Sequence, residues 1–283
     1  MLNKNIKTFN ILLKMTKILL VGYGKMGSSL ARGWLKKKLK IEISVIEKEK
    51  VLSSKKNNII FYNSFEDYFE AKKSPDIILI AIKPQQLKDI IVYLNKIYKK
   101  NIIFISVVAG ISTAWFKEKI SKEIKIVRAM PNLPSSVLSG VTGIYNSTNI
   151  LKKEIENIKI ILKSIGEIIL LKNEKLIDIV TSISGSGPAY YFYLTEVLTE
   201  VGVKLGLKKN EAEILAYQTF VGSAKLLKET KQNFSKLRKD VTSPGGTTEA
   251  ALSILMNDRN GLNKIFTKAL SAALTRAKEL GNS

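Results

Sequence analysis

The chain has 283 residues, 45% of them hydrophobic, and a chain of this length predicts a globular protein of about two domains. It contains neither cysteine nor histidine, which excludes disulfides, thiol nucleophiles, imidazole bases and the common zinc ligand sets, so no metal site is predicted. The formal net charge of +22 rests on 46 scattered basic residues with only five arginines among them, so we interpret it as a property of solvated faces and predict no nucleic-acid partner.

Residues 1–16 form a predicted N-terminal extension. Its apolar run of Ile11, Leu12 and Leu13 is shorter than the roughly 7–15 residues of a secretory signal, and no small-residue cleavage site follows. The simplest interpretation is that translation starts at Met15, directly before the first strand, and that residues 1–14 are untranslated or disordered. No later apolar run approaches the roughly 18 residues of a membrane helix, which predicts a cytoplasmic protein without a membrane partner.

From Lys17 to about Leu171, short apolar runs alternate with helical stretches, a pattern typical of parallel strands joined by crossover helices. The runs are nearly continuous in Ile, Leu and Val rather than alternating, as expected for a sheet covered on both faces. The predicted strands are residues 17–21, 42–46, 59–62, 76–81, 101–106 and 125–130. We therefore predict an α/β fold with a doubly wound, Rossmann-type parallel sheet, in a dinucleotide-binding domain over residues 17–172.

After Leu171 the strand pattern gives way to helical periodicity, which predicts an all-helical domain over residues 173–283. The longest predicted helices cover residues 188–206, 209–229 and 263–280. Pro188 suits a first turn and Gly206 a C-terminal cap. Alanine and leucine in the last helix allow close packing, either within one chain or between subunits.

A glycine-rich loop separates the first predicted strand from a helix predicted over residues 28–38. It consists of Gly22, Tyr23, Gly24, Lys25, Met26 and Gly27. In this pattern Gly22 permits the tight turn, Gly24 lets the backbone approach a pyrophosphate, and Gly27 lets the helix pack closely on the strand. Between a first strand and a first helix, the loop predicts binding of NADH or NADPH rather than a merely structural turn.

Other candidate cofactor residues follow later strands. Glu47 could accept the ribose hydroxyls of NAD and repel a 2′-phosphate, whereas Lys48 and Lys50 could bind that phosphate, so both cofactors stay open with NADH slightly favoured. The segment after the fourth strand could bracket the nicotinamide ribose, or it could be a simple strand exit with a proline starting a helix. Apart from Glu47, the candidate cofactor residues that follow predicted strands are Asn63, Ala81, Ile82, Lys83, Pro84, Ala109 and Gly110.

Several segments, in order, resemble the pyrroline-5-carboxylate reductase family, and the resemblance covers nearly everything from Lys17 onward. They are the glycine loop with Met26, and residues 81–85, 106–110, 128–134, 184–190 and 241–248, of which the last two are the most specific. The resemblance implies an oxidoreductase that makes L-proline from 1-pyrroline-5-carboxylate by hydride transfer from NAD(P)H, the final step of proline biosynthesis. It also implies a helical domain for substrate binding and dimerisation, in an interleaved homodimer or a higher homo-oligomer such as a decamer, with each site completed by the neighbouring subunit.

The resemblance further implies that one loop binds the substrate carboxylate through backbone N–H groups and hydroxyls. This loop consists of Ser243, Pro244, Gly245, Gly246, Thr247 and Thr248. The two glycines allow backbone angles that aim successive amides at an anion, and a helix is expected from Thr247 through Leu255. A Pro-Gly-Gly turn with a threonine cap would explain the loop by structure alone. In the family, Thr248 matches a threonine beside the nicotinamide and the carboxylate, and it would be the catalytic residue, acting by orientation.

Two other functions remain as alternatives. A hydroxyacid dehydrogenase would need a lysine base and a nearby asparagine on the helix of residues 188–206, which offers only Lys204 near its end and no asparagine. A non-catalytic regulator that binds a cofactor or pyridoxal phosphate would not need the loop of residues 243–248. Lys239 and Asp240, directly before that loop, and the N-terminal extension depart from the family pattern.

Overall fold

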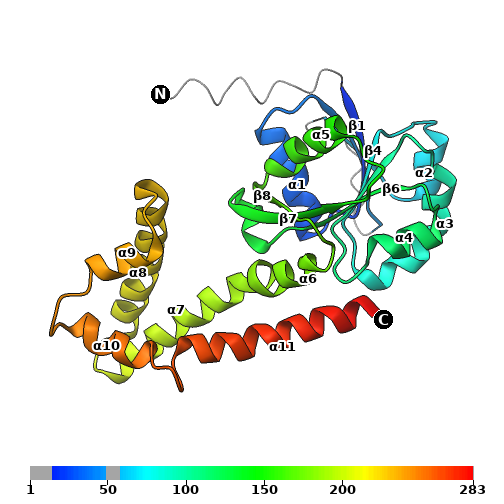
Figure 1. Cartoon of the computed structure of the whole chain (residues 1–283). Helices are drawn as coiled ribbons and strands as arrows, with labels where there is room; N and C mark the ends of the chain where they lie inside the picture. The colour runs from blue at the N-terminus through cyan, green and yellow to red at the C-terminus, as the bar shows by residue number, and fades with distance from the viewer. Residues whose placement is uncertain (1–14, 49–57, 283) are drawn as a thin grey trace. The chain divides into compact units, whose positions relative to one another are not determined.

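The structure is a computed structural model that describes residues 15–48 and 58–282 (Figure 1). The predicted extension therefore lies outside the described residues, except for the exposed Met15 and for Thr16, which already belongs to the first strand. Lys50 also lies outside them. The described residues up to Gly185 form one compact unit together with those from Leu274 on, and Ser186–Ala273 form a second.

The first unit contains an eight-stranded sheet with the strand order β3-β2-β1-β4-β5-β6-β7-β8. Neighbouring strands are parallel except for β6 and β7, which run antiparallel. The strands are β1 (Thr16–Val21), β2 (Ile41–Ile46), β3 (Ile59–Tyr62), β4 (Ile77–Ile80), β5 (Ile103–Ser106), β6 (Lys125–Met130), β7 (Gly140–Asn146) and β8 (Gly166–Leu170). The predicted doubly wound sheet is confirmed for its first six strands, whereas β7, β8 and the antiparallel pair were not predicted.

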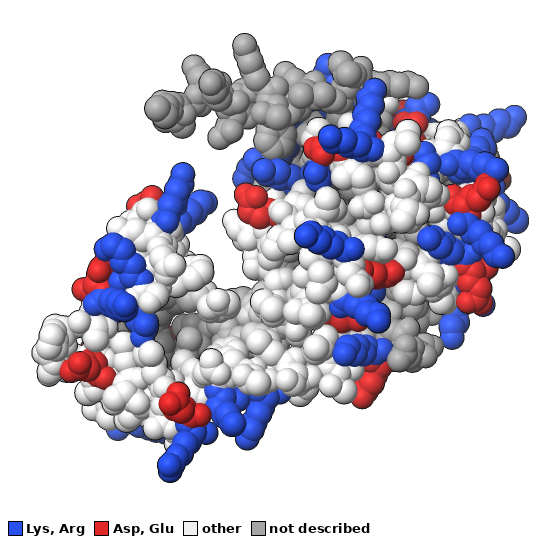
Figure 2. Space-filling model, viewed as in Figure 1, with Lys and Arg blue, Asp and Glu red and all other residues white. Residues whose placement is uncertain are grey.

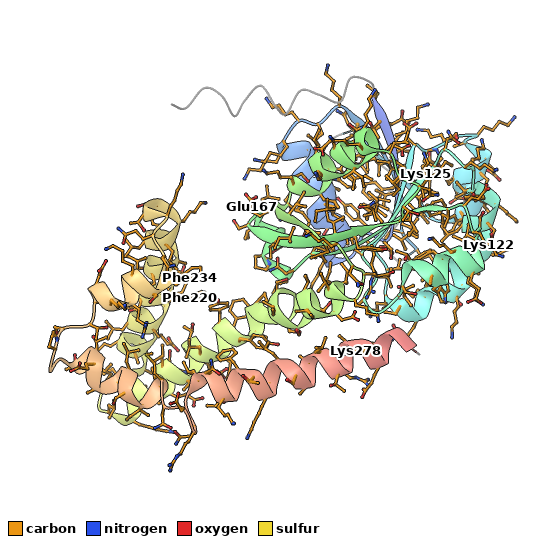
Figure 3. All side chains as sticks on the ribbon, in the orientation of Figure 1. Lys122, Lys125, Glu167, Phe220, Phe234 and Lys278 are labelled. Carbon is orange, nitrogen blue, oxygen red and sulfur yellow. The ribbon has the colours of Figure 1, made fainter. Side chains whose placement is uncertain are left out.

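Helices cover both faces of the sheet, as the continuous apolar runs predicted. In β1, Ile18 and Leu20 belong to one buried cluster, while Leu19 and Val21 belong to a second cluster on the other face. Side chains fill the space between the sheet and its helices (Figure 3). The helices of this unit are α1 (Lys25–Lys36), α2 (Phe65–Glu70), α3 (Leu87–Ile97), α4 (Thr113–Lys119), α5 (Lys152–Lys163) and α6 (Leu176–Val180).

Helix α6 explains why the first compact unit extends beyond the predicted limit at residue 172. It packs against β6 and β7, and a π-helical segment, Thr181–Gly185, continues it to the end of the unit. The predicted division into residues 17–172 and 173–283 rests on the change from a strand pattern to helical periodicity after Leu171, and it stays a prediction.

The second unit consists of helices, as predicted. They are α7 (Gly187–Lys204), α8 (Lys209–Thr230), α9 (Phe234–Asp240), α10 (Thr247–Leu255) and the first part of α11 (Leu262–Asn282). Pro188 lies in the first turn of α7, and Gly206 follows this helix with φ +112°, so both predicted helix limits are confirmed. None of the helices in the described ranges is long and apolar enough to cross a membrane.

The charged side chains are dispersed. Figure 2 shows lysine and arginine side chains spread over the visible face, with aspartate and glutamate among them. This distribution agrees with the interpretation of the net charge as a property of solvated faces.

Candidate active site

The three glycines of the loop between β1 and α1 have different surroundings. Gly22 has φ +94°, and a Cβ there would lie 2.6 Å from the carbonyl oxygen of Ala81. A Cβ on Gly27 would lie 2.1 Å from the carbonyl oxygen of Gly22, so these two positions require glycine for the fold itself. A Cβ on Gly24 would meet no atom within 4 Å. The space in front of Gly24 is therefore open, as the approach of a pyrophosphate to this backbone requires.

Helix α1 begins inside this loop, at Lys25 rather than at the predicted residue 28. Gly24 is its N-cap, no side chain caps it, and its first turn contains no acidic residue. The first N–H groups of a helix lack partners within the helix and carry its positive end, so they favour an anion. The start of α1 therefore fits the diphosphate of a dinucleotide.

A pocket lies at the carboxyl ends of β1, β2 and β4, which are neighbours in the sheet. Predicted cofactor residues that line it are Gly22, Gly24, Glu47, Ala81, Ile82 and Lys83, together with Lys48. The sequence did not point to four other lining residues, Phe65, Gln86, Asp89 and Ile90, which lie on the helical segments after β3 and β4. The general rule that ligands of such sheets also contact the helix starts could have found them.

The remaining predicted cofactor residues do not line this pocket. Lys25, Met26 and Gly27 form the first turn of α1, and Pro84 begins a short 3-10 helix, Pro84–Gln86. Asn63 is exposed directly after β3. Ala109 and Gly110 follow β5, and Gly110, with φ +78°, lines a second pocket.

Glu47 is held at the glycine loop. Its Oε2 accepts a hydrogen bond from the backbone N–H of Tyr23, with 2.7 Å between oxygen and nitrogen. The Tyr23 ring packs edge-on against Phe61 at a centroid distance of 5.0 Å, and burial raises the pKa of the Tyr23 hydroxyl. A carboxylate and the neighbouring Lys48 thus line one end of the same pocket.

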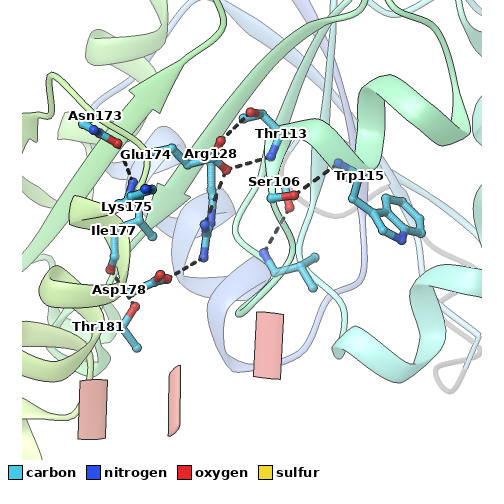
Figure 4. A network of polar contacts seen from close by, with 12 residues as sticks. Ser106, Thr113, Trp115, Arg128, Asn173, Glu174, Lys175, Ile177, Asp178 and Thr181 are labelled. Carbon is cyan, nitrogen blue, oxygen red and sulfur yellow. Dashed lines mark hydrogen bonds and ion pairs between the residues drawn. The ribbon is translucent and has the colours of Figure 1, made fainter. Parts of the chain in front are cut away.

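The second pocket contains a polar network that the sequence analysis missed (Figure 4). Arg128 of β6 is buried and contacts the carboxylates of Glu174 and Asp178, and Glu174 also binds Thr113 at the start of α4. In the sequence, Glu174 lies between an asparagine and a lysine and has the pattern of a solvated turn. The one sequence signal of this network was Arg128. An arginine inside a predicted buried strand requires polar partners.

The predicted substrate loop lies in the second unit. Gly245 has φ +69°, and Gly246 is the N-cap of α10, which begins at Thr247 and ends at Leu255 as expected. The Gly246 N–H donates to the Ser243 carbonyl oxygen at 3.0 Å, which closes the turn. The glycines and the helix start are thus as predicted.

The prediction that successive amides of this loop face an anion needs one correction. The N–H of Gly245 already donates to Glu249 Oε2 at 2.7 Å, because this glutamate reaches back from the first turn of α10. The N–H groups of the first turn itself, from Thr247 on, are those that lack helical partners. A glutamate three residues after a helix N-cap is the sequence signal that could have predicted the contact.

Known protein families match the first part of the chain and its helical part separately. A family model described as pyrroline-5-carboxylate reductase dimerisation matches residues 174–280, and one described as NADP oxidoreductase, coenzyme F420-dependent, matches residues 17–110. A pyrroline-5-carboxylate reductase of Corynebacterium melassecola is 32% identical over 271 residues, which cover 94% of this chain and 99% of that protein. The chain belongs to the pyrroline-5-carboxylate reductase family. The family resemblance seen in the sequence is thereby confirmed.

Solved structures of pyrroline-5-carboxylate reductases share the fold over nearly the whole chain. The enzyme of Coxiella burnetii is 33% identical, with a TM-score of 0.86, and the match covers 95% of this chain and 100% of that one. A pyrroline carboxylate reductase of Plasmodium falciparum, solved with NADP bound, is 29% identical with a TM-score of 0.78 and the same coverage. The Rossmann-type sheet followed by a helical dimerisation domain is therefore the architecture of this family member.

Proposed function

We propose that the chain reduces 1-pyrroline-5-carboxylate to L-proline with NADPH or NADH, which is the final step of proline biosynthesis. Family membership over nearly the whole chain supports this function. The observation that carries it is that both glycine loops open on helix starts without side-chain caps, at α1 and at α10. The reaction involves two anionic groups, the cofactor diphosphate and the substrate carboxylate, and each loop suits one of them.

In this mechanism the chain's own residues bind the substrate and the cofactor and orient them. The loop of residues 243–248 holds the substrate carboxylate on the first-turn N–H groups of α10, and the Thr248 hydroxyl orients the ring. The bound cofactor supplies the hydride that adds to the imine carbon. The proton on the imine nitrogen arrives with the substrate from solution, so no histidine or cysteine acid is needed. The rate then rests on alignment of the reacting atoms and on preorganised dipoles.

The cofactor site in this proposal is the pocket that Gly24, Glu47 and Lys83 line. Glu47 would accept the ribose hydroxyls of NADH, and Lys48 would neutralise the 2′-phosphate of NADPH. The NADP bound to the Plasmodium falciparum relative supports use of the phosphorylated cofactor, whereas the position of Glu47 favours NADH.

The assembly in this proposal is a homodimer built from the helical domain, which associates further into a decamer in the cytoplasm. The match of residues 174–280 to the dimerisation model supports a homo-oligomer. Large apolar side chains along α7 support it too, because they are exposed in the single chain. The proposed roles divide at residue 172, with cofactor binding in residues 17–172 and substrate binding and dimerisation in 173–283.

The test is an assay that follows oxidation of NADH and NADPH separately, with 1-pyrroline-5-carboxylate as substrate. Simple 2-keto acids and, in the reverse direction, 2-hydroxy acids serve as controls. We expect turnover only with the imine. Turnover with hydroxy acids instead would favour a hydroxyacid dehydrogenase, and cofactor binding without turnover of any substrate would favour a regulator.

A further inference from the structure

A partly buried polar network joins two distant segments at the carboxyl edge of the sheet (Figure 4). Glu174, two residues before α6, accepts two hydrogen bonds from Thr113, one from the backbone N–H to Oε1 at 2.7 Å and one from the hydroxyl to Oε2 at 2.5 Å. Thr113 is the first residue of α4, so its N–H has no partner within its own helix. The Glu174 carboxylate therefore fixes the start of α4 from 61 residues away.

Arg128 holds Glu174 from the other side. The arginine side chain is only 8% exposed, and its Nη1 lies 3.4 Å from Glu174 Oε1. Its Nη2 donates to Asp178 Oδ1 at 3.1 Å. Because breaking a buried ion pair leaves an uncompensated charge, these groups act as one unit. The position of the Glu174 carboxylate is thus set by β6 and α6 together.

The contact with Thr113 closes the loop of residues 107–112, which leaves β5 beside the exit of β4. At its start, the Val107 N–H donates to the Ile80 carbonyl oxygen at 3.0 Å. At its end, the loop is held through Thr113 by Glu174. Between these two points lie Ala109 and Gly110, the turn that the sequence analysis predicts to contact the cofactor. Glu174 therefore holds the second end of this turn from outside helix α4.

We propose that Glu174 is a positioning residue for the nicotinamide cofactor, which it serves by fixing the turn of Ala109 and Gly110 through Thr113. The inference rests on the proposed function for the use of a nicotinamide cofactor, and on the sequence prediction that this turn contacts it. Glu174 acts without touching the cofactor, so its loss weakens binding by loosening the turn.

The chain offers a matched control in Glu154. Its carboxylate also accepts a backbone N–H at a helix start, that of Leu151 before α5, at 2.8 Å. It also pairs with a cation of β6, Lys125, at 2.6 Å (labelled in Figure 3), but at the first residue of that strand. The two carboxylate side chains are 20% and 22% exposed. Loss of Glu154 thus imitates the structural cost of losing Glu174 at the opposite edge of the sheet.

The experiment measures the Kd of NADPH and of NADH for the full chain by fluorescence, without substrate, together with the Tm. For Glu174→Ala we expect both Kd values to rise about tenfold, because the loosened turn must be ordered again when the cofactor binds. Glu174→Gln should recover most of the affinity, since its amide oxygen still accepts the Thr113 N–H. Glu154→Ala should lower the Tm comparably and leave both Kd values unchanged.

Parental affinity in Glu174→Ala, or an equal loss of affinity in Glu154→Ala, would overturn the positioning role. Should Glu174→Ala fail to fold, Thr113→Val decides, because it removes only the hydroxyl contact. This variant should show a smaller rise in Kd, and parental affinity would again contradict the role. Since binding is measured without substrate, failure of the parent to reduce 1-pyrroline-5-carboxylate would refute the proposed function and leave this comparison valid.

Discussion

The carboxylate of Glu47, at the end of the pocket, and the backbone N–H of Tyr23, in the middle of the glycine loop, share a hydrogen bond of 2.7 Å. The contact ties the residue after β2 to the loop between β1 and α1. Glu47 therefore has two effects, because it fixes the loop backbone by accepting a hydrogen bond and it places a negative charge beside the proposed ribose site. Two substitutions separate these effects.

Glu47→Gln keeps an acceptor for Tyr23 and removes the charge. We expect the KM for NADPH to fall relative to that for NADH, since the repulsion of a 2′-phosphate disappears. Glu47→Ala also releases the loop, so it should raise the KM for NADH more than that for NADPH. Steady-state kinetics with both cofactors measures this, with Glu167→Ala on the exposed strand β8 as a control for the change in charge. Equal effects of Glu47→Ala on the two cofactors would remove Glu47 from the site.

Gly24 and Gly27 should respond oppositely to alanine. At Gly24 a Cβ meets no protein atom, so Gly24→Ala should cost only about 0.5–1 kcal/mol of stability at this N-cap but should weaken cofactor binding strongly. At Gly27 the Cβ would lie 2.1 Å from a backbone oxygen, so Gly27→Ala should cost about 3 kcal/mol or more. Thermal unfolding and cofactor titration of both variants test the pair. Unweakened binding in Gly24→Ala would show that no ligand approaches this backbone.

Thr248→Ala should reduce activity with little effect on folding. Thr248 lies in the first turn of α10, and the described chain gives its hydroxyl no hydrogen-bond partner that the change would remove. We expect stability to change by no more than about 0.5 kcal/mol, because the side chain is only partly buried and the change breaks no hydrogen bond of the described residues. The value of kcat/KM for the imine should fall roughly tenfold to a hundredfold, as for loss of an orienting group. Thr248→Ser, which keeps the hydroxyl, serves as the control, and full activity in the alanine variant would disprove the placement of the substrate.

The pair of Glu42 and Lys73 predicts how part of the stability depends on pH. Their 2.5 Å contact lowers the pKa of Glu42, chiefly through the hydrogen bond from Lys73. A carboxyl with a lowered pKa in the folded state stabilises the fold above its unfolded pKa, and this stabilisation disappears as the pH falls through the folded value. Glu42→Gln should therefore lower stability at pH 7 by about 0.5 kcal/mol, in the range of partly exposed ion pairs. The difference should begin to shrink as the pH falls below about 4 and should disappear only below the lowered pKa of Glu42 in the folded state. A difference that persists unchanged in acid would show that the charge of Glu42 contributes nothing.

The sequence was sufficient to predict a site where the local residue pattern and the sheet topology agree. The exits of β1, β2 and β4 were predictable as one site because parallel strands that are neighbours end at the same edge, which brings Gly22, Glu47 and Ala81 together. Strand β7 was missed because its glycines disfavour a strand by propensity. The structure explains them, since a Cβ on Gly143 would lie 2.9 Å from the Val180 side chain, so close packing of α6 requires glycine there.

The polar network around Arg128 shows a different limit. Thr113, Arg128 and Glu174 are far apart in the chain, and each is ordinary in its own segment. Their relationship depends on the side-by-side placement of β5, β6 and α6, which no periodicity or spacing encodes. The Glu249 contact to Gly245 is local, by contrast, and a capping pattern was present to predict it.

Helix α7 gives the last prediction, on assembly. Three consecutive residues, Tyr191, Phe192 and Tyr193, are 57%, 57% and 66% exposed in the single chain. Successive residues of a helix point about 100° apart, so these rings face three directions and no single neighbouring helix can cover them. A helical stretch that is apolar on all sides belongs in a core, which a second copy of the chain would supply here. We expect the chain to run as a dimer or larger in light scattering, and Phe192→Glu to dissociate it, while Lys209→Glu at the exposed start of α8 leaves it intact. If the neighbouring subunit completes each active site, turnover should fall in proportion to the dimer that is lost, and a fully active monomer would contradict that arrangement.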